Sequence, residues 1–162
     1  MGTRCGTIDP ATVCYLVREG GYTIDEVDTM MNKQSGILAI SGVSSDTRDV
    51  EERAQKGDAH CQMALDMFFY RTSQLIAEMA QSMHGFDTMA FSAGIGENSD
   101  TFRSAICKEL AWFGVKIDEE KNSVRSDDPR VISTEDSKIK VLVVPTNEEL
   151  MIALDVQELL SK

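Results

Sequence analysis

The sequence predicts an α/β fold that is rich in helices and contains a small sheet. Several helical patterns come first along the chain, and a strand, a helix, two strands and a last helix follow them. Only three segments are clear strand candidates in 162 residues. Sheets in α/β domains usually have about five or six strands. The shortage of strands therefore indicates that the sheet is incomplete.

Capping residues predict the first helices. Asp9 followed by Pro10 begins the first of them. Thr23 and Glu26 have the spacing of a capping box at the start of the second, which Gly36 is expected to close. The apolar run 37–42 fits either a helix or a strand, because it is too short for its periodicity to decide.

The longest helix is predicted to begin after Asp58, following a short helix that Gly57 ends. Its apolar residues recur at three- and four-residue steps over roughly 25 residues. They are Cys61, Leu65, Phe68, Thr72, Leu75, Ile76, Met79 and Met83. We expect this stripe to face the core or a protein partner.

Strands and helices alternate in the second half. A buried strand is expected at 86–91, and a glycine-rich turn and a helix follow it. The charged segment 116–129 is expected to be exposed. Two more strands are expected at 130–133 and 140–144, before a final helix.

Composition excludes several classes of function. Sixteen Lys and Arg against 27 Asp and Glu give a formal net charge of −11 without a basic cluster. This argues against nucleic acid or an anionic membrane as a partner. No window approaches the roughly 18–20 apolar residues of a membrane span, and the first residues lack the apolar run of a signal peptide, so we expect a cytoplasmic chain. The spacing of the four cysteines indicates free thiols and no zinc site.

The strongest local signal for a ligand site is the turn that contains Gly94, Ile95, Gly96, Glu97 and Asn98. Glycines let the backbone approach a ligand, and the helix that follows offers free N–H groups. The segment matches neither a Walker loop nor a dinucleotide fingerprint. Because Glu97 would repel a triphosphate, a nucleoside is the better candidate ligand. A plain tight turn is the alternative.

Glu148 follows the last predicted strand, at the edge where open sheets usually bind ligands. A carboxylate there could hold Mg²⁺ beside a phosphate. Thr146 and Glu149 have the spacing of a capping box, and complementation of the helix dipole would also explain an acidic first turn.

Two arginine segments are further candidates. Arg4 lies between glycines and could clamp a phosphate or a carboxylate, although a surface role is the alternative. Asp46, Thr47 and Arg48 lie in a polar loop where helix capping competes with ligand binding.

Five runs of residues in this order resemble the acetate kinase family. They are Met1–Pro10 (MGTRCGTIDP), Asn32–Gly36 (NKQSG), Ser44–Asp49 (SSDTRD), Phe91–Asn98 (FSAGIGEN) and Val144–Leu150 (VPTNEEL). The resemblance covers nearly the whole chain and is specific to the C-terminal half of the family. It implies reversible phosphoryl transfer from ATP to acetate, giving ADP and acetyl phosphate, with Mg²⁺ (or Mn²⁺).

The resemblance also implies roles for the candidate residues. Arg4 resembles the arginine that stabilises the phosphoryl group in flight, which fits a reaction that depends on positioning and charge neutralisation. Asp46, Thr47 and Arg48 resemble a nucleotide-contacting segment, and Gly94 to Asn98 resemble the loop on the adenosine side. Glu148 resembles the carboxylate of the magnesium site.

The implied fold is an incomplete ribonuclease-H-like domain of the actin-like and sugar-kinase superfamily, from an enzyme that is usually a cytoplasmic homodimer. Residues 1–162 would be its C-terminal part, without the N-terminal domain and the first strands. The family's catalytic aspartate and acetate-site arginine would lie outside the chain, so we expect the chain alone to be inactive. A propionate or butyrate kinase homologue, or a non-catalytic module that pairs with a separate N-terminal half, are the alternatives.

Overall fold

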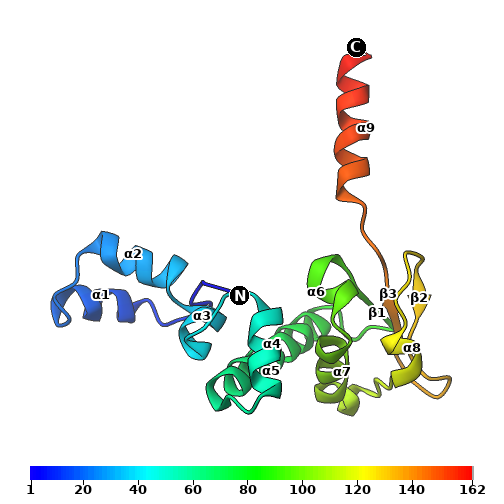
Figure 1. The fold of residues 1–162 in the computed structure, drawn as a ribbon, viewed down its shortest axis with the longest axis horizontal. Helices are drawn as coiled ribbons and strands as arrows, with labels where there is room; N and C mark the ends of the chain where they lie inside the picture. The colour runs from blue at the N-terminus through cyan, green and yellow to red at the C-terminus, as the bar shows by residue number, and fades with distance from the viewer. Residues whose placement is uncertain (162) are drawn as a thin grey trace. The chain divides into compact units, whose positions relative to one another are not determined.

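The computed structural model describes residues 1–161, which form two compact units (Figure 1). The first runs from Met1 to Arg71 and the second from Thr72 to the C-terminal end. Helices dominate both units, and the sheet belongs to the second.

The first unit is helical throughout its regular structure. Its helices are α1 (Ala11–Arg18), α2 (Ile24–Lys33), α3 (Gly36–Ser41), α4 (Thr47–Gln55) and the first half of α5 (Ala59–Ser82). The predicted capping box is confirmed, because the Glu26 amide donates to Thr23 Oγ1 at 3.3 Å and the Thr23 amide donates to Glu26 Oε2 at 2.8 Å.

The ambiguous apolar run is a helix, α3. The sequence had suggested that Gly36 closes α2, but Gly36 is instead the first residue of α3. Its φ of +64° is the physical reason, since a left-handed residue lets the chain turn between α2 and α3.

The long helix α5 is confirmed with 24 residues. Asp58 caps it by accepting hydrogen bonds from the amides of His60 and Cys61. The burial of the predicted stripe decreases along the chain: Cys61 and Leu65 are buried, whereas Met79 and Met83 are more than half exposed.

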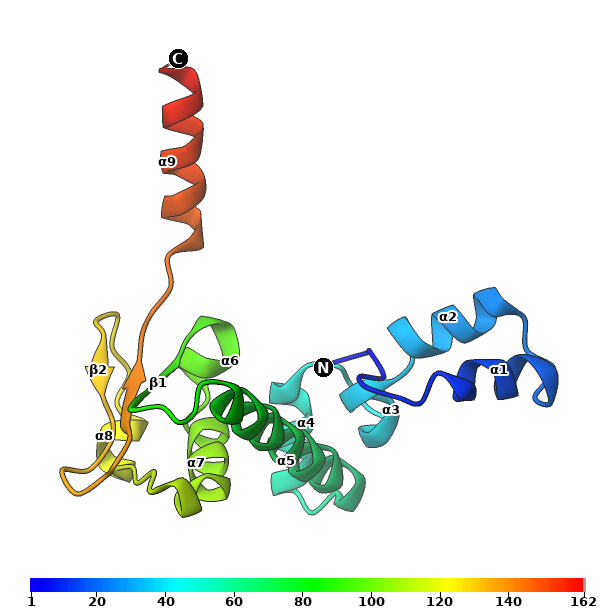
Figure 2. The same cartoon turned by 180° about the vertical axis from the view of Figure 1, so that it is seen from behind.

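The second unit contains a three-stranded sheet in the order β1–β3–β2. Figure 1 labels the three strands, and Figure 2 shows the same ribbon from behind. The strand β1 (Thr88–Phe91) runs parallel to β3 (Lys140–Val143), and β2 (Arg130–Val131) runs antiparallel to β3. The expectation of a buried strand at 86–91 is wrong for most of its length. Only Phe91 of β1 is buried, because β1 is an edge strand with a single neighbour among the described residues.

The other regular elements of this unit are helical. They are α6 (Ala93–Asn98), α7 (Asp100–Glu109), the 3₁₀ turn η1 (Ala111–Phe113), α8 (Glu119–Ser123) and α9 (Glu148–Leu160). The core combines Ile106 of α7 and Leu110, which follows α7, with Val141 and Val143 of β3, all at most 1% exposed. The rings of Phe91 and Phe102 meet edge to face at 6.0 Å.

One further expectation for this unit is corrected. The glycine-rich segment after β1 is the helix α6 and not a turn. The charged segment 116–129 is mostly exposed, as expected, and contains α8, whose Asn122 is the one buried residue of the segment, at 1% exposure. This asparagine is buried because its side chain is hydrogen bonded to the equally buried Arg103.

All four cysteines are free, as expected. None of the helices in the described part of the chain combines the length and the apolar character of a membrane span.

Candidate functional site

The carboxyl ends of the two parallel strands form one edge of the candidate site. Phe91, the last residue of β1, is in register with Val143, the last residue of β3. The helix α6 follows β1, and the segment that leads to α9 follows β3. Both candidate segments of the second unit therefore start from the edge where parallel sheets bind ligands.

The two glycines of α6 have different roles. A Cβ built on Gly94 would meet no atom within 4 Å, so this position leaves room for a ligand. Gly96 is buried, and its Cβ would lie 3.3 Å from the backbone of Phe91, so it allows α6 to pack on β1. The unusual backbone belongs to Ala93, whose φ is +58°. A non-glycine residue in this region is uncommon and often marks a functional segment.

Glu97, near the end of α6, is joined to the segment after β3. Its Oε1 accepts hydrogen bonds from the amide and from the hydroxyl of Thr146, both at 2.9 Å. These bonds lower the pKa of Glu97, the amide of Thr146 having the largest effect. Asn98 is also engaged within the protein, because its side-chain amide donates to the Gly94 carbonyl at 2.8 Å.

The expected capping box of the last helix is wrong. The residue that caps α9 is Asn147, whose Oδ1 accepts from the Leu150 amide at 2.9 Å. Thr146 is bound to Glu97 and therefore does not cap the helix. Glu148 lies exposed in the first turn of α9. Its carboxylate is therefore accessible to a cation.

Arg103 of α7 holds the end of α6 through hydrogen bonds. No signal in the sequence indicated this residue. Its guanidinium is almost fully buried, at 2% exposure. Nη1 donates to the carbonyls of Gly96 and Glu97, both at 2.9 Å, while Nε and Nη2 donate to the side chain and the carbonyl of Asn122 at 2.7 and 2.6 Å. Arg103 thus fixes the last turn of α6.

In the first unit, the segment around Arg4 lies against α2 and α3. The amides of Ser35 and Ile37 donate to the carbonyls of Thr3 and Met1, at 2.8 and 3.1 Å. The Arg4 side chain is exposed, and no ion pair within residues 1–161 involves it. Its guanidinium is therefore available to an anion.

Gly36 allows this close approach. A Cβ at Gly36 would lie 2.4 Å from the Met1 carbonyl oxygen, whereas a Cβ at Gly42 would meet nothing within 4 Å. Both residues have a positive φ, +64° and +67°. We expect G36A to destabilise the chain by about 1–3 kcal/mol more than the matched control G42A, because only G36A adds a steric clash. Urea unfolding followed by circular dichroism measures the difference. Equal losses would contradict the close packing of the Arg4 segment.

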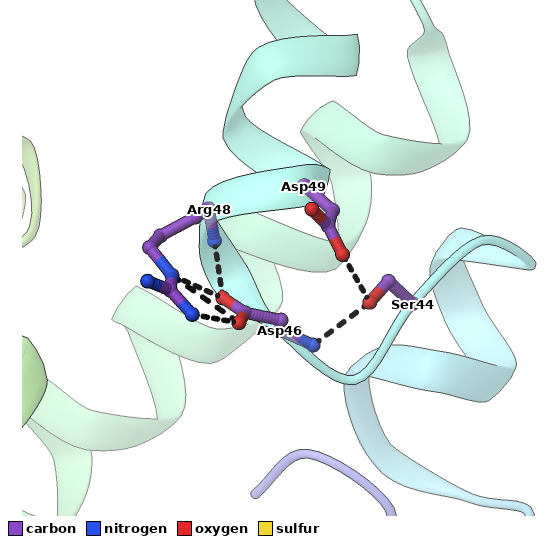
Figure 3. A network of polar contacts seen from close by, with 4 residues as sticks. All are labelled: Ser44, Asp46, Arg48 and Asp49. Carbon is purple, nitrogen blue, oxygen red and sulfur yellow. Dashed lines mark hydrogen bonds and ion pairs between the residues drawn. The ribbon is translucent and has the colours of Figure 1, made fainter.

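Asp46 and Arg48 form an ion pair at the start of α4 (Figure 3). Asp46 accepts from the Arg48 amide at 2.9 Å as the cap of α4, and its carboxylate also accepts from Nε and Nη2 of Arg48. Ser44 connects this pair to Asp49, to which its hydroxyl donates at 2.7 Å. Capping thus holds the carboxylate, while the Arg48 side chain remains 87% exposed and open to a ligand.

The Asp46–Arg48 pair predicts a measurable titration. The side-chain hydrogen bond from Arg48 lowers the pKa of Asp46 from 3.8 to about 2. Because the pKa is lowered in the folded chain, the pair stabilises the fold above pH 3.8, and this contribution is lost as the pH falls toward about 2. We expect R48A to return the midpoint of the Asp46 carboxyl, followed by NMR, toward 3.8. An unchanged midpoint in R48A would show that Arg48 is not the cause.

The sequence-predicted residues fall into two groups. In the first unit, the segment that contains Arg4 meets the segment that contains Asp46 at Gly2, where a built Cβ would lie 3.0 Å from the Ser45 carbonyl oxygen. The second unit brings α6 together with the segment that leads to Glu148. No cluster of three or more His, Cys, Asp or Glu side chains suited to a metal occurs among the described residues. A single exposed carboxylate fits Mg²⁺, which often takes one or two carboxylates and completes its shell with phosphate and water.

Comparison with known proteins gives consistent matches. A family model described as "Acetokinase family" matches residues 1–154. The chain is 53% identical over 162 residues to acetate kinase 2 of Clostridium perfringens (strain 13 / Type A), covering all of this chain and 40% of that protein. The chain spans about 40% of the length of such curated relatives.

Solved structures of the same kind share the fold. The crystal structure of Porphyromonas gingivalis acetate kinase matches with a TM-score of 0.88 and 37% identity, covering 99% of this chain and 40% of that one. A propionate kinase from Francisella tularensis subsp. tularensis matches with a TM-score of 0.85 and 38% identity, covering 94% of this chain and 38% of that one.

Proposed function

Since the chain belongs to the acetokinase family, we propose that it is the C-terminal, nucleotide-binding part of an acetate kinase. The parent enzyme reversibly transfers the γ-phosphoryl group of ATP to acetate with Mg²⁺, giving ADP and acetyl phosphate. The observation that carries the proposal is the match over residues 1–154, combined with a glycine-containing helix and an exposed carboxylate at one sheet edge.

Each candidate group has a role in this proposal. Arg4 neutralises charge on the phosphoryl group in flight, which suits its exposed guanidinium. Arg48 and its neighbours Asp46 and Thr47 contact the nucleotide, and α6 receives the adenosine beside Gly94, where space is open. Glu148 would hold Mg²⁺, which would supply positive charge to offset the charge of the phosphates. In the complete enzyme we propose a cytoplasmic homodimer.

The chain alone is proposed to be inactive. The hydroxamate assay of acetyl phosphate formation tests this with the purified 162-residue chain, ATP, Mg²⁺ and acetate. We expect no turnover above a blank without protein. Substantial turnover would contradict the proposed division of the site. Propionate and butyrate are tested in parallel, because a propionate kinase structure is also similar to the chain.

The second candidate function is an interaction module that pairs with the remaining part of the family sequence. A specific surface favours it, which we name the α5–β1 groove. This groove has a volume of about 300 Å³ and is lined by Thr72, Leu75, Ile76, Met79, Met83, Phe86, Thr88 and Met89. It lies beside β1, which pairs only with β3 among the described strands. An open strand edge next to apolar side chains favours the addition of a strand from a partner.

Size-exclusion chromatography with light scattering tests this pairing. The chain is mixed with the part of C. perfringens acetate kinase 2 that it does not match, and we expect a one-to-one complex. M79D places a charge in the groove and should prevent the complex, whereas Q81E, on the same helix outside the groove, should not. If the chain elutes as a monomer in the presence of the added part, the proposed role as an interaction module is contradicted.

A further inference from the structure

The bonds between Glu97 and Thr146 connect two segments that are far apart in sequence. A single carboxylate oxygen of Glu97 accepts both the amide and the hydroxyl of Thr146, 49 residues away. Two donors from one residue on one acceptor fix the position of that residue more closely than a single bond does. The pair therefore ties α6 to the segment after β3.

This pair also controls where α9 begins. Glu148 lies two residues after Thr146, and Asn147 between them caps the helix. No residue of α9 is buried, so packing contributes little to the position of its first turn. In Figure 1 and Figure 2, α9 extends from the end of β3 with no other described element of its unit alongside it. The hydrogen bonds to Glu97 are thus the main restraint on the backbone that presents Glu148.

Glu97 is poorly suited to contact the nucleoside at the same time. Its carboxylate accepts from Thr146, and the Ala93 amide adds to the interactions that lower its pKa, so it remains ionised at neutral pH. An ionised carboxylate with several donors already in place has less capacity for a donor from a ligand.

We propose that Glu97 is a positioning residue that acts through Thr146 to place the Glu148 carboxylate for Mg²⁺ on a bound nucleotide. This inference rests on the proposed function, from which the role of Glu148 comes. It differs from a direct contact between Glu97 and the nucleoside. A direct contact would strengthen nucleotide binding with and without the metal, whereas positioning acts only when Mg²⁺ is present.

Calorimetric titration of the chain with ADP, once with Mg²⁺ and once with EDTA, separates the two roles. We expect E97A to raise the Kd of ADP with Mg²⁺ about tenfold, the effect typical of removing a group that orients a metal ligand. The Kd with EDTA should change less than about twofold. E97Q and T146S keep the hydrogen-bonding groups and should recover most of the affinity. E109Q, an exposed charge change on α7, is the matched control.

Two further measurements make the test specific. In a double-mutant cycle, E97A should not raise the Kd of ADP with Mg²⁺ further in an E148Q background, because both changes remove the contribution of the Glu148 carboxylate to metal binding. Hydrogen exchange at the Thr146 amide should become faster in E97A and stay unchanged in E109Q. This exchange reports on the hydrogen bond itself and does not require a ligand.

The outcomes are distinguishable. Unchanged exchange at Thr146 in E97A, or equal losses of ADP affinity with Mg²⁺ and with EDTA, would overturn the positioning role and leave the proposed function intact. If the unmodified chain binds no ADP, the proposed function fails, and the role of Glu97 fails with it. Faster exchange together with a loss confined to the Mg²⁺ titration supports both.

Discussion

Replacing Arg103 by alanine is expected to lower the free energy of unfolding of the second unit by about 3–5 kcal/mol, the cost typical of breaking a buried charged network. The guanidinium is 2% exposed and donates four hydrogen bonds, to the carbonyls of Gly96 and Glu97 and to two oxygens of Asn122. Alanine leaves these buried acceptors without their donors. Urea unfolding followed by circular dichroism measures the loss.

The matched control is R125A, which removes the same charge from an exposed position in the same unit. We expect R125A to change stability by less than about 0.5 kcal/mol, as surface substitutions usually do. R103K keeps the charge, but the lysine ammonium cannot reproduce the planar set of N–H donors of a guanidinium. We therefore expect R103K to lose most of the stability that R103A loses. If R103A lowers the free energy of unfolding only slightly, the hydrogen bonds of Arg103 do not stabilise α6 as proposed.

Replacing Arg4 by alanine is expected to slow phosphoryl transfer about 1,000-fold, the range known for arginines that neutralise a transferred phosphoryl group. The measurement uses a chimera in which this chain replaces the 40% of C. perfringens acetate kinase 2 that it matches at 53% identity. The hydroxamate assay then gives kcat and the KM for ATP. We expect the loss in kcat, with little change in KM, because an arginine in the proposed role stabilises mainly the transition state.

Two comparisons make the Arg4 result specific. R4K keeps a positive charge without the paired hydrogen bonds and should recover only part of the rate. R18A removes an exposed arginine from the last turn of α1 and should leave the rate unchanged. Because Arg4 is exposed, R4A should not change the unfolding curve. An active R4A chimera would contradict the role of this residue.

Local sequence signals predicted most of the fold. The capping box of Thr23 and Glu26, the cap of α5 at Asp58 and the order of strands and helices are all confirmed. These features depend on residues within a few positions of each other, where spacing carries the information. The same reasoning failed for α6, where the glycines suggested a turn although Arg103 holds a helix in place.

The contacts that organise the candidate site could not be predicted from the sequence. Arg103 reaches Asn122 across 19 residues, and Glu97 reaches Thr146 across 49. Polar pairs at such separations leave no periodic pattern, and Thr146 had a competing local interpretation as part of a capping box. The sequence indicated candidate segments, whose role in ligand binding stays a prediction, and the structure showed which of their side chains bind each other.

The proposal that this chain holds the nucleotide half of an acetate kinase site is tested most directly by titrating the unmodified chain with ADP and Mg²⁺ in a calorimeter. We predict saturable binding of one ADP per chain. G94V, which fills the open space beside α6, should raise the Kd of ADP at least about tenfold, or about 1.4 kcal/mol, without changing the unfolding curve. No saturable binding, or equal binding by G94V, would contradict the account.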